Sequence, residues 1–137
     1  MKRVHGTAVA IEGKGVLIQG PSGSGKSDLA LRLIDGGARL IADDQTELHE
    51  APGGGAVMRA PAAIAGKIEV RGVGVLPLPN LAEAPLRLVV ALVPATQVER
   101  LPEPKFAEYF QQSVPILTIA PFEASAPAKI RLALAVL

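Results

Sequence analysis

Short apolar runs alternate with glycine-rich turns in the first third of the chain. Residues 4–11 and 15–19 each predict a strand, and the turn-prone EGKG segment joins them. Residues 27–35 carry apolar side chains around most of a helix, with Asp28, Arg32 and Asp35 gathered on one face. The pattern therefore predicts two strands, a glycine-rich loop and a mostly buried helix that the following Gly-Gly pair stops.

The middle of the chain predicts three further strands. Residues 38–48 begin as a short apolar strand that ends in two acids. Residues 68–78 alternate between apolar and polar positions but are interrupted by glycines, which indicates a strand broken near a functional site. Residues 85–94, PLRLVVALVP, form the clearest core strand.

The last third predicts a surface excursion, one strand and a helix. Residues 96–110 are charged and contain two prolines, so we expect them to leave the core. Residues 114–121 predict the last strand, and Ser125 can cap a helix that has Pro127 in its first turn. The apolar side of this helix carries Ile130, Ala133, Leu134 and Leu137.

Length and composition limit the classes of protein. The 137 residues contain no repeat and no linker, which predicts a single α/β domain over residues 1–137. The residues are 49% hydrophobic but only 3% aromatic, so the core must be aliphatic. A net charge of +1 from scattered charges argues against a nucleic-acid partner. The absence of cysteine excludes disulfides, thiolate zinc sites and cysteine nucleophiles.

No membrane partner or secretion signal is expected. The longest apolar run, residues 88–93, is long enough for a strand but not for a membrane span. The N-terminal segment reaches His5 and Gly6 before any long apolar stretch, which argues against a signal peptide. We therefore expect a cytoplasmic protein.

The segment GPSGSGKS satisfies every fixed position of the phosphate-binding pattern G-x-x-x-x-G-K-[ST]. Its glycines let successive backbone N–H groups surround a β-phosphate, and the following helix adds its positive dipole end. Lys26 is expected to reach the β- and γ-phosphates of ATP, and the Ser27 hydroxyl to bind Mg²⁺. The predicted nucleotide-binding residues are Gly20, Pro21, Ser22, Gly23, Ser24, Gly25, Lys26 and Ser27.

Two adjacent acids, Asp43 and Asp44, follow 17 and 18 positions after Lys26. That spacing fits a compact strand–helix–strand unit whose second strand is parallel to the first and ends at the same edge of the sheet. One acid can hold the metal, and the other can accept a proton from an attacking hydroxyl. The alternative is an acidic turn that caps the next segment.

The phosphate acceptor is inferred from what the chain lacks. It has little room for the lid with which small-molecule kinases exclude water. It contains no N-K-x-D element for reading guanine, and ATPase motors are usually longer. A short kinase that uses its protein substrate as the lid remains.

Two segments carry a family resemblance. Residues 5–44, HGTAVAIEGKGVLIQGPSGSGKSDLALRLIDGGARLIADD, and residues 68–75, IEVRGVGV, resemble bacterial HPr kinase/phosphorylase, in a short form lacking the N-terminal domain. The resemblance implies a P-loop kinase fold with a mixed central sheet and flanking helices. It also implies ATP-dependent phosphorylation of a serine on HPr, a carrier protein of the phosphotransferase system, with reversal by phosphate. A homo-oligomer is expected by the same analogy.

The resemblance also assigns roles outside the phosphate loop. It matches His5 to a histidine before the first strand, Asp43 or Asp44 to the catalytic acid, and Glu69 with Arg71 to a signature pair. Glu69 would be a second Mg²⁺ ligand alongside Ser27, and Arg71 would neutralise the transferring phosphate. With Asp44 as the acid that holds the metal, the predicted metal ligands are Ser27, Glu69 and Asp44.

Lys129 lies where relatives carry a phosphate-contacting loop that is richer in arginine, and by the resemblance it would stand in for that loop. The departure bears above all on the reverse reaction, which uses phosphate. Without the resemblance, His5, Lys129 and the Glu69–Arg71 pair are equally compatible with solvated surface positions. Two other functions stay open: a small-molecule phosphotransferase, and a sensor that binds ATP without transferring phosphate.

Overall fold

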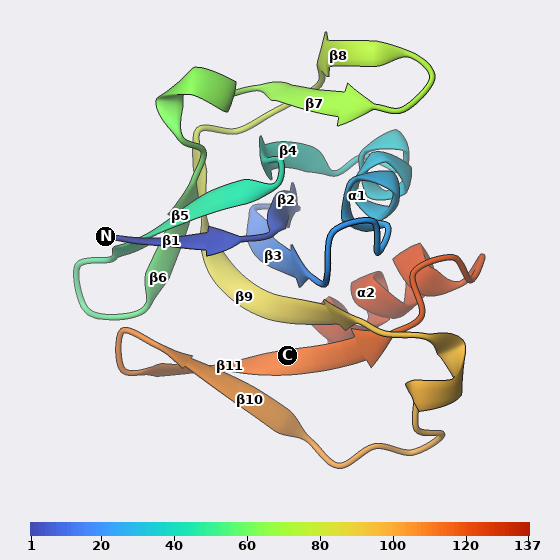
Figure 1. Cartoon of the computed structure of the whole chain (residues 1–137). Helices are drawn as coiled ribbons and strands as arrows, with labels where there is room; N and C mark the ends of the chain where they lie inside the picture. The colour runs from blue at the N-terminus through green and yellow to red at the C-terminus, as the bar shows by residue number, and fades with distance from the viewer.

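A computed structural model describes residues 1–137, which form two α-helices and eleven strands (Figure 1). The helices are α1 (Lys26–Asp35) and α2 (Ala126–Ala135), and neither is long and apolar enough to cross a membrane. Short 3₁₀ turns occupy Ala62–Ile64 and Ala95–Gln97. The strands are β1 (Lys2–His5), β2 (Thr7–Ile11), β3 (Lys14–Gln19), β4 (Arg39–Ala42), β5 (Gln45–Glu50), β6 (Ala56–Arg59), β7 (Lys67–Val70), β8 (Gly74–Pro77), β9 (Glu83–Leu92), β10 (Lys105–Tyr109) and β11 (Gln112–Ile119).

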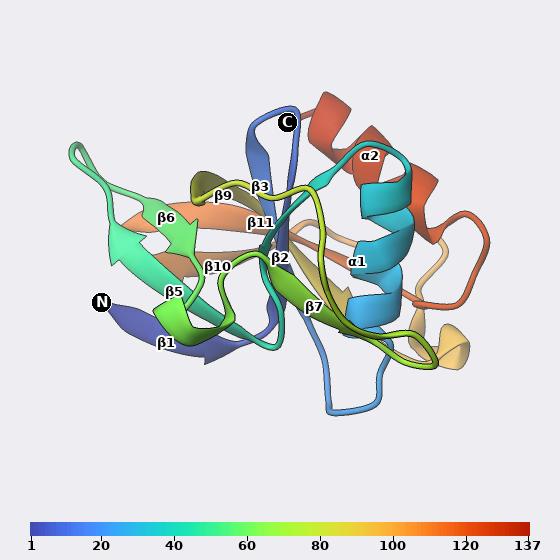
Figure 2. The same cartoon turned by 90° about the horizontal axis from the view of Figure 1, so that it is seen from above.

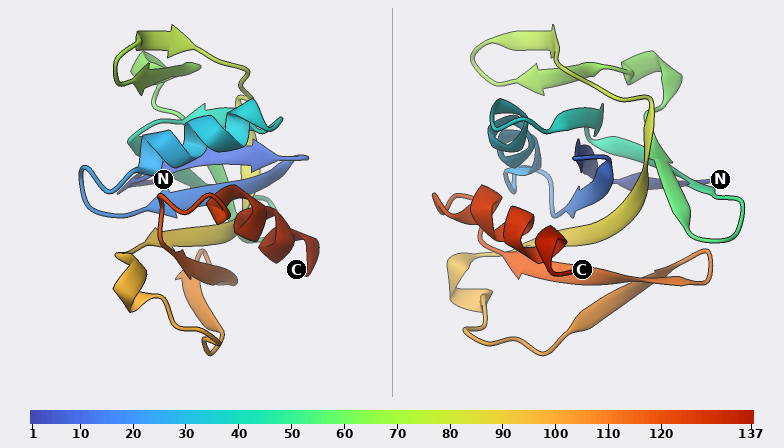
Figure 3. Two further views of the ribbon diagram at one scale, coloured as in Figure 1. Left: turned by 90° about the vertical axis from the view of Figure 1, so that its right-hand side faces the viewer. Right: turned by 180° about the vertical axis from the view of Figure 1, so that it is seen from behind.

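Nine strands form one mixed sheet, and the long curved strand β9 joins its parts (Figure 3). β9 runs parallel to β3 and to β11, and Val89 lies opposite Leu17 on one side and Ile116 on the other. Its first residues pair antiparallel with β6. The strand order is β1-β5-β6-β9-β3-β2-β4, with β11 beside β9 and β10 beside β11. The mixed sheet with flanking helices confirms the predicted fold class.

The strands that lead into the candidate site run in the same direction. β2 lies between β3 and β4 and is antiparallel to both. β3 and β4, which α1 connects, are therefore parallel to each other, as predicted, although β2 separates them. Their carboxyl ends at Gln19 and Ala42 lie at the same edge of the sheet. The glycine-rich loop and the two acids follow these ends and so meet at that edge.

Both helices cover the same face of the sheet (Figure 2). Alternate residues of β3 divide between two cores, because successive side chains of a strand point to opposite faces. Val16 and Ile18 pack with Leu29 of α1 in the first core. Leu17 packs with Met58 in the second core, on the face that β5 and β6 cover. The central strands are therefore buried on both faces, which explains their continuous apolar runs.

Two predicted segments each form two strands in the structure, and both breaks lie at the candidate site. Residues 4–11 form β1 and β2, separated at Gly6, whose N–H donates a 2.8 Å hydrogen bond to the Asp44 carbonyl. Residues 38–48 form β4 and β5, separated at Asp43 and Asp44. Asp44 has a φ of 67°, a left-handed conformation that Asp tolerates better than most residues. The hydrogen bond between Gly6 and Asp44 fixes where both segments turn.

Three other expectations concern the surface. Residues 96–110 lie mostly at the surface, as predicted, but their last part is a strand, because β10 pairs antiparallel with β11. β10 is an exposed edge strand and therefore lacks an apolar pattern. Residues 68–78 form a separate hairpin of β7 and β8, with its glycine-rich turn after Val70. Ser125 precedes α2 without a side-chain capping bond, because its backbone is already helical, with φ −81° and ψ −4°.

Gly15 in β3 provides a test of the packing between β3 and β9. A Cβ at this position would collide with the carbonyl oxygen of Pro85 and would lie 2.5 Å from Met58 Cε. A backbone carbonyl in a paired strand cannot move aside as a flexible side chain can. We therefore expect Gly15→Ala to lower the free energy of unfolding by about 1–3 kcal/mol, measured by urea denaturation followed by circular dichroism. The neighbouring exposed substitution Lys14→Ala should change it by less than about 0.5 kcal/mol, and equal losses would contradict this account.

Candidate active site

The predicted phosphate loop connects the end of β3 to the start of α1 (Figure 1). Gly23 and Gly25 have φ values of 80° and 101°, which residues with a Cβ adopt only with strain. Gly25 is also the residue before the first turn of α1, and its carbonyl accepts a 2.9 Å bond from the Leu29 N–H. The loop thus ends at a helix N-terminus, where backbone N–H groups lack helical partners and favour an anion.

Lys26 lies across this loop instead of extending into solvent. Only 6% of the residue is exposed, and its ammonium donates to the carbonyl oxygens of Gly20 at 2.9 Å and Pro21 at 3.0 Å. These carbonyls are neutral, so the buried charge has no anionic partner. The Ser24 hydroxyl is also buried, without a hydrogen-bond partner. A bound phosphate would supply the missing negative charge and acceptors.

The Asp43 carboxylate is the centre of a group of hydrogen bonds. Its Oδ1 accepts from the Ser27 hydroxyl at 2.6 Å and from the Thr7 hydroxyl at 3.3 Å. Its Oδ2 accepts from the Glu69 backbone N–H at 3.3 Å. The donors come from α1, β2 and β7, so this carboxylate joins three elements beside the phosphate loop. Sequence reasoning did not single out Thr7, which has no motif signal.

Asp44 faces a different partner. Its Oδ1 lies 2.7 Å from His5 Nε2, and the Asp44 side chain is 63% exposed. Its backbone N–H donates to the Thr7 hydroxyl at 3.1 Å, which fixes the turn between β4 and β5. The structure thus brings His5 to the site, as the resemblance implied, and separates the two adjacent acids by their surroundings.

The acid beside Ser27 differs from the one in the predicted set of metal ligands. Ser27, Glu69 and Asp44 were expected to gather around Mg²⁺, but the carboxylate beside Ser27 is that of Asp43. Glu69 adjoins Asp43 through its backbone N–H, and its side chain is exposed. No three His, Cys, Asp or Glu side chains lie close enough together to hold a metal ion by themselves. Asp43, and not Asp44, is therefore the acid in contact with Ser27, and the set of metal ligands stays a prediction.

Arg71 and Lys129 lie outside this group. Arg71 is exposed in the turn after β7. Lys129, in the first turns of α2, pairs with Glu123 at 2.7 Å, and its side chain is 41% exposed. Lys129 is thus paired with a carboxylate and Arg71 is exposed to solvent, so both phosphate contacts stay predictions.

The polar side chains at the loop are of the kinds that bind a nucleotide with Mg²⁺. Mg²⁺ typically takes one or two protein oxygens and completes its shell with phosphates and water, so a hydroxyl beside one carboxylate is an adequate protein contribution. Ser27 and Asp43 supply that pair at 2.6 Å. The unpaired Ser24 hydroxyl and the buried Lys26 ammonium fit the phosphates.

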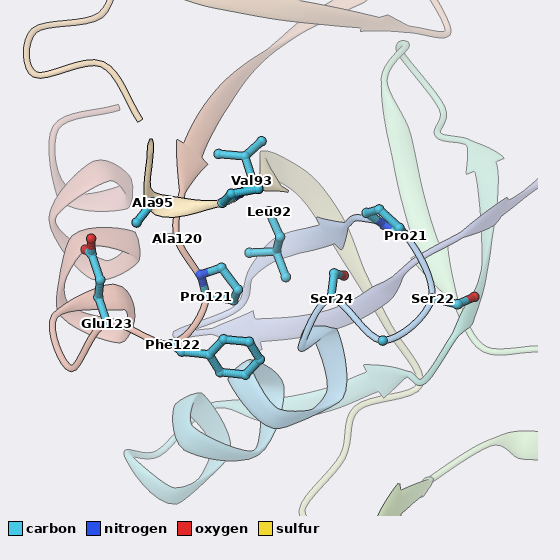
Figure 4. Close-up of a pocket in the computed structure, with 12 residues that line it drawn as sticks. Pro21, Ser22, Ser24, Leu92, Val93, Ala95, Ala120, Pro121, Phe122 and Glu123 are labelled. Atoms are coloured by element: carbon cyan, nitrogen blue, oxygen red, sulfur yellow. The ribbon is translucent and has the colours of Figure 1, made fainter. Parts of the chain in front are cut away.

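A cavity of about 500 Å³ adjoins the phosphate loop on a side where neither Ser27 nor Asp43 contributes (Figure 4). Its walls come from residues 21–24, 92–95 and 120–123. The loop after β11 is held against α1 by Arg32, which donates to the carbonyl oxygens of Pro121 and, at 3.3 Å, Glu123. Sequence reasoning treated Arg32 as one of several charges on a helix face and did not find this cavity. No local pattern could have revealed it, because its three walls are far apart in the sequence.

The sequence is similar to proteins of a single family. Residues 1–128 match the profile of the HPr Serine kinase C-terminal domain. An HPr kinase/phosphorylase from Lactobacillus johnsonii is 36% identical over 129 residues, which cover 86% of this chain and 40% of that protein. Another from Levilactobacillus brevis is 46% identical over 78 residues, covering 57% of this chain and 25% of that protein.

A solved structure has the same fold. The Hpr(Ser) kinase/phosphatase from Coxiella burnetii superposes with a TM-score of 0.84 at 23% identity, covering 98% of this chain and 89% of that chain. The chain spans between 25% and 40% of the length of the two curated relatives above. The profile match extends over nearly all of the present sequence, including the phosphate loop and both acids. The chain belongs to the HPr serine kinase C-terminal domain family.

Proposed function

We propose that this chain is the catalytic domain of an ATP-dependent kinase that phosphorylates a serine of an HPr-like phosphocarrier protein. The observation that carries the proposal is the 2.6 Å contact between Ser27, at the end of the phosphate loop, and Asp43. Ser27 directly follows Lys26 in the sequence, so this contact places a hydroxyl and a carboxylate at the end of the phosphate loop, where they can bind a metal ion. The names of the relatives, HPr kinase/phosphorylase, support the acceptor and the reverse reaction with phosphate.

The loop and Lys26 stabilise charge on the transferring phosphoryl group. Backbone N–H groups at the start of α1 point toward the position of the phosphates, and they are fixed before the nucleotide arrives. Lys26 now donates to two loop carbonyls, and it can turn from them to the γ-phosphate oxygens. Donors that need no reorganisation account for most of the rate in phosphoryl transfer.

Asp43 is proposed as the acid on the metal side. It accepts a hydrogen bond from the Ser27 hydroxyl, which leaves the oxygen lone pairs of Ser27 free for a cation. Bound Mg²⁺ supplies charge neutralisation for the β- and γ-phosphates. Glu69 is close enough through its backbone to join this group if its exposed side chain turns inward.

Asp44 is proposed as the base. Asp43 already accepts three hydrogen bonds, whereas the side chain of Asp44 has only His5 as a partner and is 63% exposed. A protein serine can therefore reach Asp44 and transfer its proton to that carboxylate as the serine oxygen attacks the γ-phosphorus, while the bond between the γ-phosphorus and the bridging β–γ oxygen breaks and ADP leaves. His5 holds the carboxylate in place. Arg71 is proposed to neutralise the phosphoryl oxygens, and Lys129 to contact phosphate after leaving Glu123.

The proposal also covers the cellular setting. A chain without cysteine suits the reducing cytoplasm, where we expect the protein to act. We further expect a homo-oligomer, which analytical ultracentrifugation would measure directly.

The acceptor is tested by incubating the protein with labelled ATP and Mg²⁺, with and without purified HPr. We expect label on a serine of HPr. Lys26→Ala should reduce the rate by about 10²-fold or more, because it removes charge stabilisation in the transition state. Lys14→Ala, which removes an exposed lysine from the start of β3, is the matched control and should keep the rate. Label on a metabolite instead would favour a small-molecule phosphotransferase, and binding without transfer would favour a sensor.

The roles of the two acids are tested by comparing Asp43→Asn with Asp44→Asn. Asp44→Asn should lower kcat by about 10²-fold or more and leave the Mg²⁺ dependence of nucleotide binding unchanged. Asp43→Asn should raise the Mg²⁺ concentration needed for half-maximal nucleotide binding by about tenfold or more. The measurements are initial rates and a Mg²⁺ titration of nucleotide binding. The reverse pattern would exchange the two roles.

A further inference from the structure

The cavity beside the phosphate loop has the size of a site for a small molecule. Its volume of about 500 Å³ falls within the range typical of ligand pockets, about 300–1,000 Å³. It begins at the loop itself, since residues 21–24 form one wall. Any ligand that places phosphates in the loop can therefore extend into the cavity without leaving the protein surface.

An exposed aromatic ring forms part of the wall. The chain contains only three phenylalanines and one tyrosine, yet Phe122 is 70% exposed beside the loop. Its ring abuts the loop backbone, because a Cβ on Gly25 would lie 2.8 Å from Phe122 Cζ. Figure 4 shows the ring beside Pro121, on the side of the loop segment that carries Ser24. A flat ligand that stacks on this ring would remove its apolar surface from water, which favours binding.

The segment that carries this ring is held from both ends. Arg32 of α1 donates to the carbonyl oxygens of Pro121 and Glu123, on either side of Phe122. Lys129 of α2 pairs with the Glu123 carboxylate at 2.7 Å. Phe122 therefore lies on a segment that is hydrogen-bonded to α1, the helix that starts at the phosphate loop. Such fixing reduces the entropy lost when a ligand stacks on the ring.

We infer that this cavity binds the base and ribose of the nucleotide, with Phe122 as the surface on which the base stacks. The inference rests on the proposed function, because it requires phosphates in the loop. The side chains that line the cavity offer few hydrogen-bonding groups: Ser22, Ser24 and Glu123, of which Glu123 is already paired. The Ser24 hydroxyl, buried without a partner, can bond to the ribose or the first phosphate.

This chemistry predicts a preference for purine nucleotides without strong discrimination between adenine and guanine. Stacking depends on the area of the base and is tolerant of its edge groups. Strong discrimination between bases needs polar groups that are left unpaired by the wrong base, and the side chains of this cavity offer few. Affinities for ATP and GTP should therefore agree within about tenfold.

The test compares ATP, GTP and inorganic tripolyphosphate, each with Mg²⁺, by isothermal titration calorimetry. Phe122→Ala should weaken ATP binding by about tenfold, the typical loss for one stacked base, and leave tripolyphosphate binding unchanged. Phe106→Ala is the matched control, because Phe106 is 59% exposed on β10 and outside the cavity. It should leave both affinities unchanged.

A second variant reports on the stacking itself. The chain contains no tryptophan, so Phe122→Trp introduces a single fluorophore into the cavity. ATP should quench its emission and tripolyphosphate should not. Absence of a difference between the two ligands would overturn the inference, as would equal weakening of both ligands by Phe122→Ala or a preference for ATP over GTP well above tenfold. If wild-type protein fails to bind tripolyphosphate at all, the proposed phosphate loop fails instead.

Discussion

The candidate site depends on one carboxylate at the break between β4 and β5. Asp43 accepts hydrogen bonds from Ser27 on α1, Thr7 on β2 and the backbone of Glu69 on β7. These elements come from separate parts of the chain, and the β7–β8 hairpin is not part of the main sheet. A charge with several donors in a partly buried position holds its partners more firmly than neutral bonds do. The same contacts therefore position the phosphate loop, the Ser27–Asp43 pair and the hairpin that precedes and follows Arg71.

The parts of the site that the sequence predicts are those with local causes. The phosphate loop needs glycines at positive φ, and Gly23 and Gly25 have such values. The helix after the loop and the core strand β9 follow from apolar patterns that both cores use. The direction of β4 follows from the short connection through α1, so the arrival of Asp43 and Asp44 at the loop was predictable.

What the sequence could not predict depends on contacts between distant segments. Asp43 and Asp44 are neighbours with the same side chain, yet Asp43 contacts Ser27 and Asp44 contacts His5, and the chain turns between them with a left-handed φ at Asp44. The edge strand β10 has no apolar pattern because solvent covers it, so it resembled a loop. The break at Gly6 is set by its bond to the Asp44 carbonyl, which lies 38 residues farther along the chain.

The phosphate end and the cavity end of the proposed nucleotide site are built from different kinds of groups. The phosphate end is made of backbone N–H groups and one buried ammonium, so its requirements are strict and appear as a continuous motif. The cavity end is made of apolar side chains from three segments, and many sequences could line it equally well. Phosphate binding therefore constrains the sequence strongly, whereas base binding does not. For the same reason most of the affinity for a nucleotide should come from the charged end. The cavity should set only the additional affinity that a particular base contributes.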